Sequence, residues 1–225
     1  MTEIRHLAIT KTSAENDDLL LMQNPTTGET YNIKKSDFLA GLSSSGNTGS
    51  GGNTPSNINL TFATSGDVNG LFYYLGTAKG TQPWDNPTNR GLLISVSSIG
   101  VGFPVSLVNR DASEFYTNNA PQSWVAFDIG TSKLRCNYYL LRNRNVADHY
   151  LRSWSFQGSN DGSTWMTLDN QINNAVLNTP SQWLALPVVS NTPYSVFRLL
   201  QTGQNSAGYN YLCLGEVELY GEYIA

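Results

Sequence analysis

The chain has 225 residues, which is enough for one good-sized core with a small appendage, and only 13% of them are charged, against about 25% in an average soluble protein. Its 13 basic and 17 acidic residues give a formal net charge of −4, which excludes the basic surface expected of a nucleic-acid-binding protein. The 20 glycines, nine prolines and 11% aromatic residues are typical of an all-β chain with many turns.

The first 42 residues predict a small head. They lack the basic start, apolar run and cleavage site of a signal peptide, so we expect no export by that route. The runs 19–23 and 30–34 flank a turn-rich segment and predict a β-hairpin. Ser36 stands where the N-cap of a short helix ending near Gly41 is expected. A head of this size rarely folds alone, so we expect it to use a partner surface.

Residues 43–57 contain no large apolar side chain and are rich in Gly, Ser, Asn and Thr. This composition predicts a flexible linker. It divides the chain into the head, 1–42, and a body, 58–225. No stretch approaches the roughly 18 consecutive apolar residues of a membrane span, so we expect no membrane insertion.

The body consists of short apolar or alternating runs separated by turn residues. No convincing helical period lies between the runs, so they predict an antiparallel β-sandwich or barrel. The predicted strands are 69–75, 91–97, 123–129, 134–142, 151–158, 165–168, 182–188, 194–201 and 211–221.

Several carboxylates of the body could be mistaken for catalytic acids. Asp161 lies in Asn-Asp-Gly, a tight-turn sequence between two aromatic runs, and is expected to be structural. Asp128, in an apolar strand, is expected to accept bonds from neighbouring backbone N–H groups. Glu216 and Glu218 share one face of the last strand, where we expect solvent exposure, the alternative being a contact with the end of the sandwich or with a cation.

Cys136 and Cys213 each lie within an apolar or aromatic run. Small buried thiols fit such runs, so two free core cysteines are favoured over a disulfide, which stays open as the alternative.

The sequence predicts no catalytic residues. Its two histidines, His6 and His149, form no zinc-binding pair, and no Gly-x-Ser-x-Gly elbow occurs. The glycine cluster in the linker lacks the Lys-Ser/Thr ending of a phosphate loop. We therefore expect no enzyme, although paired carboxylates brought together by folding, as in glycoside cleavage, stay an alternative.

Ordered motifs across the body resemble the discoidin family, also called the coagulation-factor type C domain, a galactose-binding-like jelly roll. The resemblance is greatest to the variant found beside BTB and ubiquitin-ligase modules, in which Gly-Ser-Asn-Asp-Gly followed by Trp recurs. The terminal cysteine pair of the secreted blood-factor versions is absent. The motifs lie at 69–77, 84–87, 97–98, 115–117, 123–130, 138–142, 151–165, 197–199 and 212–221.

This resemblance implies a ligand site in loops at one rim of the jelly roll, here 99–106, 109–122, 143–150 and 203–210. Aromatic rings there can stack on a sugar, while Arg, His and Asn can bind hydroxyl groups. The candidate ligand-binding residues are Phe103, Tyr116, Arg144, His149 and Tyr209, with Asn118, Asn119 and Asn145 as possible additions.

The resemblance also bears on the framework and on metals. Trp84 lies in a loop expected at the opposite end of the sandwich, which makes it a framework residue. Some discoidin relatives hold a structural calcium ion, and Asp111 and Glu216 occupy the corresponding positions. We predict no cofactor, leave calcium open, and make no assignment of any other metal.

The head resembles the opening segments of bacteriophage tail-fibre and baseplate-attached proteins. The order of head, linker and sugar-binding-like domain then implies a virion receptor-binding protein, assembled in the host cytoplasm, that is homotrimeric, docks to the tail or baseplate through 1–42 and binds a host-surface glycan. The alternatives are a structural baseplate or virion-decoration protein that binds other virion proteins, and a carbohydrate-binding accessory module of a cellular adhesin or enzyme.

Overall fold

The computed structural model describes residues 19–23, 30–34 and 57–225, and its contacts divide the chain into two units, Met1–Asn53 and Thr54–Ala225. In the first unit β1 (Leu19–Gln23) pairs antiparallel with β2 (Thr30–Lys34), with Leu21 opposite Asn32. The predicted hairpin strands are thereby confirmed. The helix expected after Ser36 and the linker lie outside the described residues.

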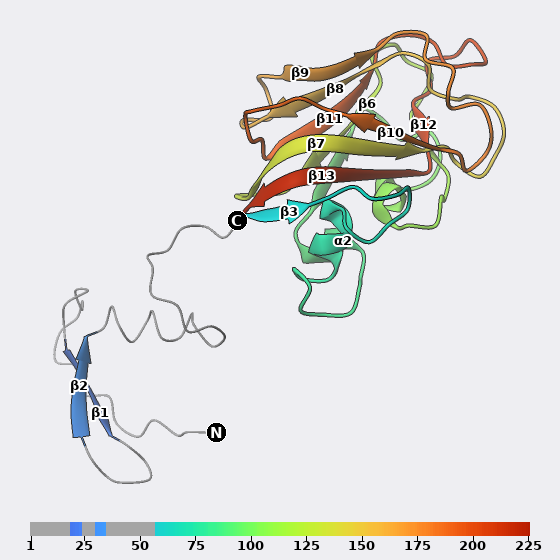
Figure 1. Cartoon of the computed structure of the whole chain (residues 1–225). Coiled ribbons are helices and arrows are strands. Elements are labelled where there is room, and N and C mark those ends of the chain that lie inside the picture. Colours follow the sequence, from blue (N-terminus) through green and yellow to red (C-terminus); the bar gives the residue numbers. More distant parts are fainter. Residues whose placement is uncertain (1–18, 24–29, 35–56) are drawn as a thin grey trace. The chain divides into compact units, whose positions relative to one another are not determined.

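The second unit, the body, is an antiparallel β-sandwich (Figure 1). One sheet has the order β10-β7-β13-β3, formed by Trp183–Pro187, Lys133–Arg142, Glu216–Ile224 and Ile58–Leu60. The other has the order β4-β6-β11-β8-β9, formed by Leu93–Val96, Trp124–Asp128, Val196–Gln201, Trp154–Ser159 and Met166–Gln171. All neighbouring strands are antiparallel, so the predicted sandwich is confirmed.

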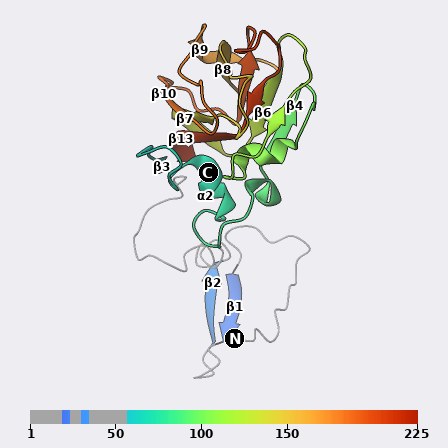
Figure 2. The ribbon, with the colours of Figure 1, turned by 90° about the vertical axis from the view of Figure 1, so that its right-hand side faces the viewer.

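The two sheets face each other across one core, and Figure 2 places β7, β10 and β13 on one side of the body and β4 and β6 on the other. Strand alternation builds this core: along β11, Phe197, Leu199 and Gln201 are buried while their neighbours are partly exposed. At its centre Tyr139 stacks on Phe156 with ring centroids 4.3 Å apart.

The polar atoms of the central aromatic side chains are hydrogen-bonded. The Tyr139 hydroxyl accepts a hydrogen bond from Trp154 Nε1 at 2.9 Å and donates to Asp169 Oδ2 at 2.6 Å. Burial without such partners would cost on the order of 1–3 kcal/mol for each group. The bonds therefore fix one arrangement of the large aromatic side chains.

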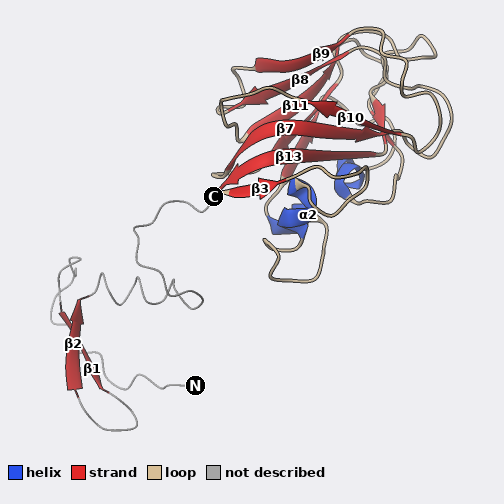
Figure 3. Ribbon diagram, viewed as in Figure 1, coloured by secondary structure: helices blue, strands red, loops and turns tan. Residues whose placement is uncertain are grey.

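The strand predicted at 69–75 is wrong, because this segment forms the helix α2 (Leu71–Gly76). Leu71, Phe72 and Gly76 face the core, a helical spacing that was misread as a short apolar strand. Two 3-10 helices, Pro87–Arg90 and Pro104–Val108, complete the helical content of the described residues, which is small (Figure 3). No helix among the described residues is long and apolar enough to cross a membrane.

The N-cap position of α2 is Gly70, which provides no side-chain hydrogen bond to the helix start. The cap comes instead from Glu218 on β13, whose carboxylate accepts hydrogen bonds from the backbone N–H groups of Phe72 at 2.7 Å and Tyr73 at 3.1 Å. A carboxylate at this position satisfies donors that a helix start leaves unpaired. The expectation that Glu216 and Glu218 face solvent is therefore wrong, since their residues are 3% and 4% exposed.

Both cysteines are free and buried, which confirms the thiol prediction. Burial raises the pKa of Cys136 and of Cys213 to about 12. Both thiols consequently stay protonated and are poor nucleophiles at neutral pH.

The first strand of the body, β3, lies beside the end of its last strand, β13. Strand β3 pairs with the last part of β13, with Ile58 opposite Tyr223, so the start of the body adjoins the end of β13 (Figure 1). The other end of β13 begins with Glu216 opposite Arg142, two residues before Arg144.

Candidate functional site

One end of the sandwich carries a cavity of about 240 Å³, here called the rim cluster. Its side chains come from β5 (Phe115–Tyr116), from the loop after β7, and from β12 (Cys213–Leu214) with the loop before it. The pairing of β5 with β12 brings two of these segments together. The lining residues are Tyr116, Arg144, His149, Tyr209, Tyr211 and Cys213.

Aromatic rings form most of the wall of the rim cluster. The ring centroids of Tyr209 and Tyr211 are 5.4 Å apart, and His149 lies 5.5 Å from the first and 5.4 Å from the second. Tyr116 meets Tyr211 edge-on at 5.5 Å. Such contiguous rings offer flat apolar faces together with hydroxyl groups.

Arg144 lies at the centre of the rim cluster, with its side chain only 8% exposed. Its Nη1 pairs with the Glu114 carboxylate, Nη2 lies 3.0 Å from His149 Nδ1, and Cζ lies 5.4 Å from the Tyr116 ring centroid. Because arginine can only donate, Nδ1 of His149 must accept, which leaves its proton on Nε2. Arg144 Nε is buried and has no hydrogen-bond partner in the described structure.

The loops around the rim cluster are held in place by hydrogen bonds between them. Tyr150 and Ser206 exchange two bonds of 2.9 Å, from Tyr150 N–H to Ser206 Oγ and from Ser206 N–H to the Tyr150 carbonyl. Asn119 Oδ1 accepts the N–H of Asn210 at 2.8 Å. Asp148 and His149 both adopt positive φ, 71° and 60°, which is uncommon outside glycine and is maintained only where surrounding contacts impose it.

The structure brings together four of the five predicted ligand-binding residues, namely Tyr116, Arg144, His149 and Tyr209. Phe103 is not among them: its side chain is 73% exposed and does not line the cavity. Sequence reasoning missed Tyr211 and Cys213. The alternation of Tyr209, Tyr211 and Cys213 at every second position was the signal that could have placed them on one face.

The three asparagines suggested as additional ligand-binding residues differ in position. Asn119 supports the loop before β12 through its bond to Asn210, whereas Asn118 and Asn145 are exposed and do not line the cavity. Trp84 also lies outside the rim cluster. Its indole packs against Gly76 of α2, where an added Cβ would be 2.7 Å from Trp84 Nε1.

Asp111 and Glu216 do not fit a calcium site as they stand. Glu216 is partnered by Arg142 at 3.3 Å, and Arg110 acts on it as a second nearby cation; burial nevertheless raises the pKa of Glu216. Asp111 binds Asn109 Nδ2 at 2.6 Å and the Ser113 N–H at 2.9 Å. Throughout the described residues, no three His, Cys, Asp or Glu side chains are grouped to hold a metal ion.

The predicted structural carboxylates have the expected local partners. Asp128 Oδ1 accepts the N–H of Gly130 at 2.8 Å. Asp161 Oδ1 accepts the N–H groups of Ser163 at 2.8 Å and Thr164 at 2.6 Å, and these two bonds, that of Thr164 foremost, lower the pKa of Asp161 well below its usual value.

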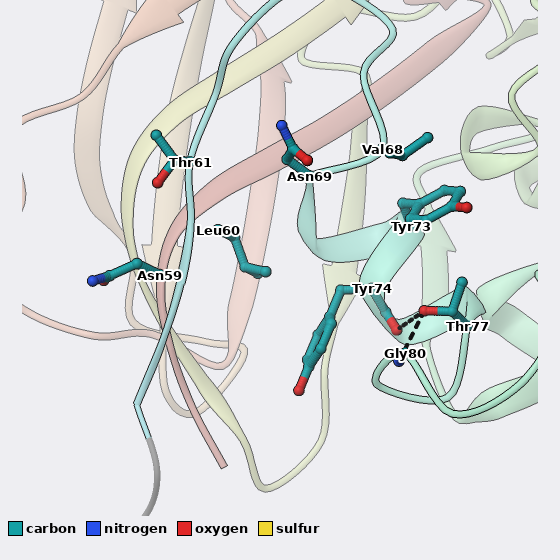
Figure 4. A pocket seen from close by; sticks show the side chains of 9 residues that line it. All are labelled: Asn59, Leu60, Thr61, Val68, Asn69, Tyr73, Tyr74, Thr77 and Gly80. Carbon is teal, nitrogen blue, oxygen red and sulfur yellow. Dashed lines mark hydrogen bonds between the residues drawn. The ribbon is translucent and has the colours of Figure 1, made fainter.

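A second hollow, of about 490 Å³, lies between β3 and α2 (Figure 4). Tyr73, Tyr74 and Asn69 line it, and no lining side chain is charged. Thr77 closes one side by donating from Oγ1 to the Tyr74 carbonyl at 2.9 Å and accepting the Gly80 N–H at 3.0 Å. None of the predicted ligand-binding residues lies there.

No family model matches the chain. The chain is 32% identical over 169 residues to the E3 ubiquitin-protein ligase Ufd4 of Drosophila melanogaster, over 70% of this chain and 6% of that protein. It is 30% identical over 178 residues to a BTB/POZ domain-containing protein of Arabidopsis thaliana, over 72% of this chain and 22% of that protein. The chain therefore spans only a small part of these curated relatives.

Among solved structures, the body matches the carbohydrate-binding module CBM32-3 from a family 31 glycoside hydrolase of Clostridium perfringens. The TM-score is 0.50 at 12% sequence identity, covering 58% of this chain and 90% of that module. This match confirms the galactose-binding-like jelly roll that the discoidin resemblance implied. At this identity it establishes the fold alone.

Proposed function

We propose that the body is a non-catalytic glycan-binding module and that the rim cluster is its site. The observation that supports this most directly is the convergence of three tyrosines, His149 and a buried arginine around one cavity. Aromatic faces with a few fixed polar groups are the usual composition of small-molecule sites. The cavity, about 240 Å³, is of a size for one terminal sugar unit.

Charge in the rim cluster favours a neutral sugar. Glu114 pairs with Arg144, so the guanidinium is already neutralised and serves as a hydrogen-bond donor more than as an anion receptor. Its geometry is fixed in advance by Glu114, His149 and the Tyr116 ring, which reduces the entropy lost on binding.

At the level of the whole protein, we propose a bacteriophage tail-fibre or receptor-binding protein that acts in the virion. The support is the order of an attachment-like head, 1–42, a polar linker, 43–57, and a sugar-binding-like body. Docking through the head and trimerisation belong to the same proposal. Several weak sites on one particle would raise the overall avidity.

A protein-binding body is the second candidate function. The names of the two curated relatives, a ubiquitin ligase at 32% identity and a BTB/POZ domain-containing protein at 30%, refer to no carbohydrate, and this is the observation that keeps the second candidate. In the virion this candidate corresponds to a structural baseplate or decoration protein. A carbohydrate-binding accessory module of a cellular adhesin or enzyme is a separate alternative, which keeps the glycan site and gives up the virion.

The test is binding of the full chain to a glycan array and to candidate bacterial cells, comparing wild type with Tyr209→Ala and Phe103→Ala. Tyr209 lines the cavity, whereas Phe103 is an exposed aromatic residue outside it, so the second variant is the matched control. We expect Tyr209→Ala to weaken neutral-glycan binding by about tenfold or more and Phe103→Ala to leave it unchanged.

Binding to no glycan and no cell, with retained assembly onto tail proteins, would favour the protein-binding candidate. Light scattering of the full chain tests the trimer separately, and a stable monomer would remove that part of the proposal.

A further inference from the structure

We propose that the outer face of the five-stranded sheet carries a second binding site, a trough for a neutral glycan segment, separate from the rim cluster. The trough has a volume of about 530 Å³. It shares no lining residue with the rim cluster, so the proposal stands or fails independently of rim binding. The lining residues are Ser95, Trp124, Ala126, Asp128, Gly130, Asn160, Asp161, Gly162, Trp165, Ser195, Val196 and Arg198.

Strand register explains why the sheet is hollow here. Ala126 on β6 lies opposite Ser95 on β4 and opposite Arg198 on β11, and paired residues point to the same face of the sheet. Two small side chains thus stand side by side in the middle of the face, with Val196 next along β11. They form a floor between larger neighbours.

Indole rings form part of the trough wall. Trp124, two residues before Ala126 on β6, and Trp165, from the turn between β8 and β9, are both partly exposed. The Arg198 guanidinium lies 4.0 Å from the Trp165 ring centroid, and Gln157 Oε1 accepts from its Nε at 2.8 Å and its Nη2 at 2.6 Å. The Trp165 side of the trough is therefore held rigidly before any ligand arrives.

Acceptor groups lie at the end of the trough away from Trp124. Asp128 and Asp161 each use Oδ1 to accept backbone N–H groups of their own turns, and the Thr164 side chain is a further hydrogen-bond partner of the Asp161 carboxylate. The bond to Oδ1 orients the Asp128 carboxylate, whose Oδ2 has no hydrogen-bond partner among the described residues and is therefore a positioned acceptor for a hydroxyl group. Two carboxylates against one guanidinium also disfavour an anionic ligand.

These features fit a sugar better than a peptide. Beneath the centre of the trough, β6 and β11 are each paired on both sides within the sheet, so a peptide lying in the trough cannot add to them as a strand. The floor offers only Ala126 and Val196 as aliphatic contacts, which is little for the apolar side chains that anchor peptides. Flat indole faces beside fixed hydroxyl acceptors suit the amphipathic ring of a pyranose.

The experiment uses the full chain on an array of neutral and acidic glycans and compares four proteins: wild type, Ser95→Trp, Val189→Trp and Tyr209→Ala. Ser95 is exposed at the trough floor, so a tryptophan there fills the space without removing a buried contact. Val189 is 93% exposed and lines neither the trough nor the rim cluster, which makes it the control for an added surface tryptophan. Thermal unfolding confirms that each variant is folded.

We expect a set of neutral glycans whose binding falls about tenfold or more in Ser95→Trp and is retained in Val189→Trp and Tyr209→Ala. Addition of such a glycan should shift the indole N–H resonances of Trp124 and Trp165, assigned through Trp→Phe variants, and leave that of the buried Trp154 unchanged. Glycans lost only in Tyr209→Ala report the rim cluster.

The proposal is overturned if no glycan is selectively lost in Ser95→Trp, or if those lost are acidic. It is also overturned if Ser95→Trp instead abolishes binding of a protein partner, because the trough would then be a protein-docking surface.

Discussion

At Glu218, burial moves the protonation of a carboxyl group into the neutral pH range. Its carboxylate is enclosed between β13 and the start of α2, and burial raises its pKa to about 7 despite three backbone N–H donors. The strand alternation predicted that Glu218 shares a face with Glu216, but it could not indicate that Phe72, 146 residues earlier in the chain, is a hydrogen-bond partner of Glu218. Hydrophobic periodicity reports only on neighbouring residues and cannot predict such a contact.

The raised pKa predicts that stability falls as pH increases. An ordinary glutamate has a pKa near 4.5, so between about pH 4.5 and 7 the folded state binds more protons at Glu218 than the unfolded state. The stabilisation of the folded state by the proton on Glu218 is complete below pH 4.5 and is lost as pH rises through about 7. The loss for this group amounts to at most about 3 kcal/mol, measurable by urea unfolding at pH 5 and pH 8.

Glu218→Gln keeps the shape of the side chain and removes the titration. We expect the unfolding free energy of this variant to change less between pH 5 and pH 8 than that of wild type. An unaltered pH dependence would assign the effect to another group.

Gly70 is required because Glu218 occupies the space of its missing side chain. A Cβ there would lie 2.2 Å from Glu218 Cγ and 2.3 Å from Cδ. Gly70→Ala should therefore destabilise the body by about 1–3 kcal/mol in chemical denaturation.

Truncation of Glu218 should relieve this clash, so Gly70→Ala and Glu218→Ala are expected to be strongly non-additive. Additive effects of the two changes would mean that the clash is not what makes Gly70 necessary.

At the scale of elements, the structure agrees with the sequence where the signal was local. The turn between β8 and β9 was predicted from Asn-Asp-Gly, and its bonds run within six residues, from Ser159 to Thr164. The segment 69–75 was misread because its helix depends on a distant cap. Strands β3 and β5 were missed because three and two residues are too few to show alternation.

The turn between β8 and β9 gives a test of backbone conformation alone. Gly162 has a φ of +67°, and nothing lies within 4 Å of a Cβ built on it. Gly162→Ala should cost about 1 kcal/mol through the left-handed backbone and not through a clash. Gly162→Asn should cost less, because asparagine tolerates this region, and equal losses in urea unfolding would contradict this explanation.

The candidate site shows the same division between local and distant information. Loop composition and the discoidin resemblance selected Tyr116, Arg144, His149 and Tyr209, which converge. The same reasoning could not exclude Phe103, because whether an aromatic residue in a loop points into a cavity depends on the backbone path. Nor could it indicate that Glu114 neutralises Arg144.

For the whole molecule, two buried thiols predict insensitivity to redox conditions. Cys136 and Cys213 are free and buried, so the melting temperature should be the same with and without a reducing agent. A thiol reagent such as DTNB should react only slowly with the folded protein. After denaturation it should react with both cysteines. A melting temperature that falls on reduction would indicate a disulfide and contradict the structure.

The pairing of β3 with the end of β13 has a mechanical consequence. Both connections of the body leave the sandwich side by side, while the rim cluster adjoins the opposite end of β13, where Glu216 faces Arg142. A fold with adjacent ends can be spliced into a loop of a larger polypeptide or fused to either terminus with little strain. In such arrangements the connections lie at the end of β13 remote from the rim cluster, so a tether attached there does not cover the cavity.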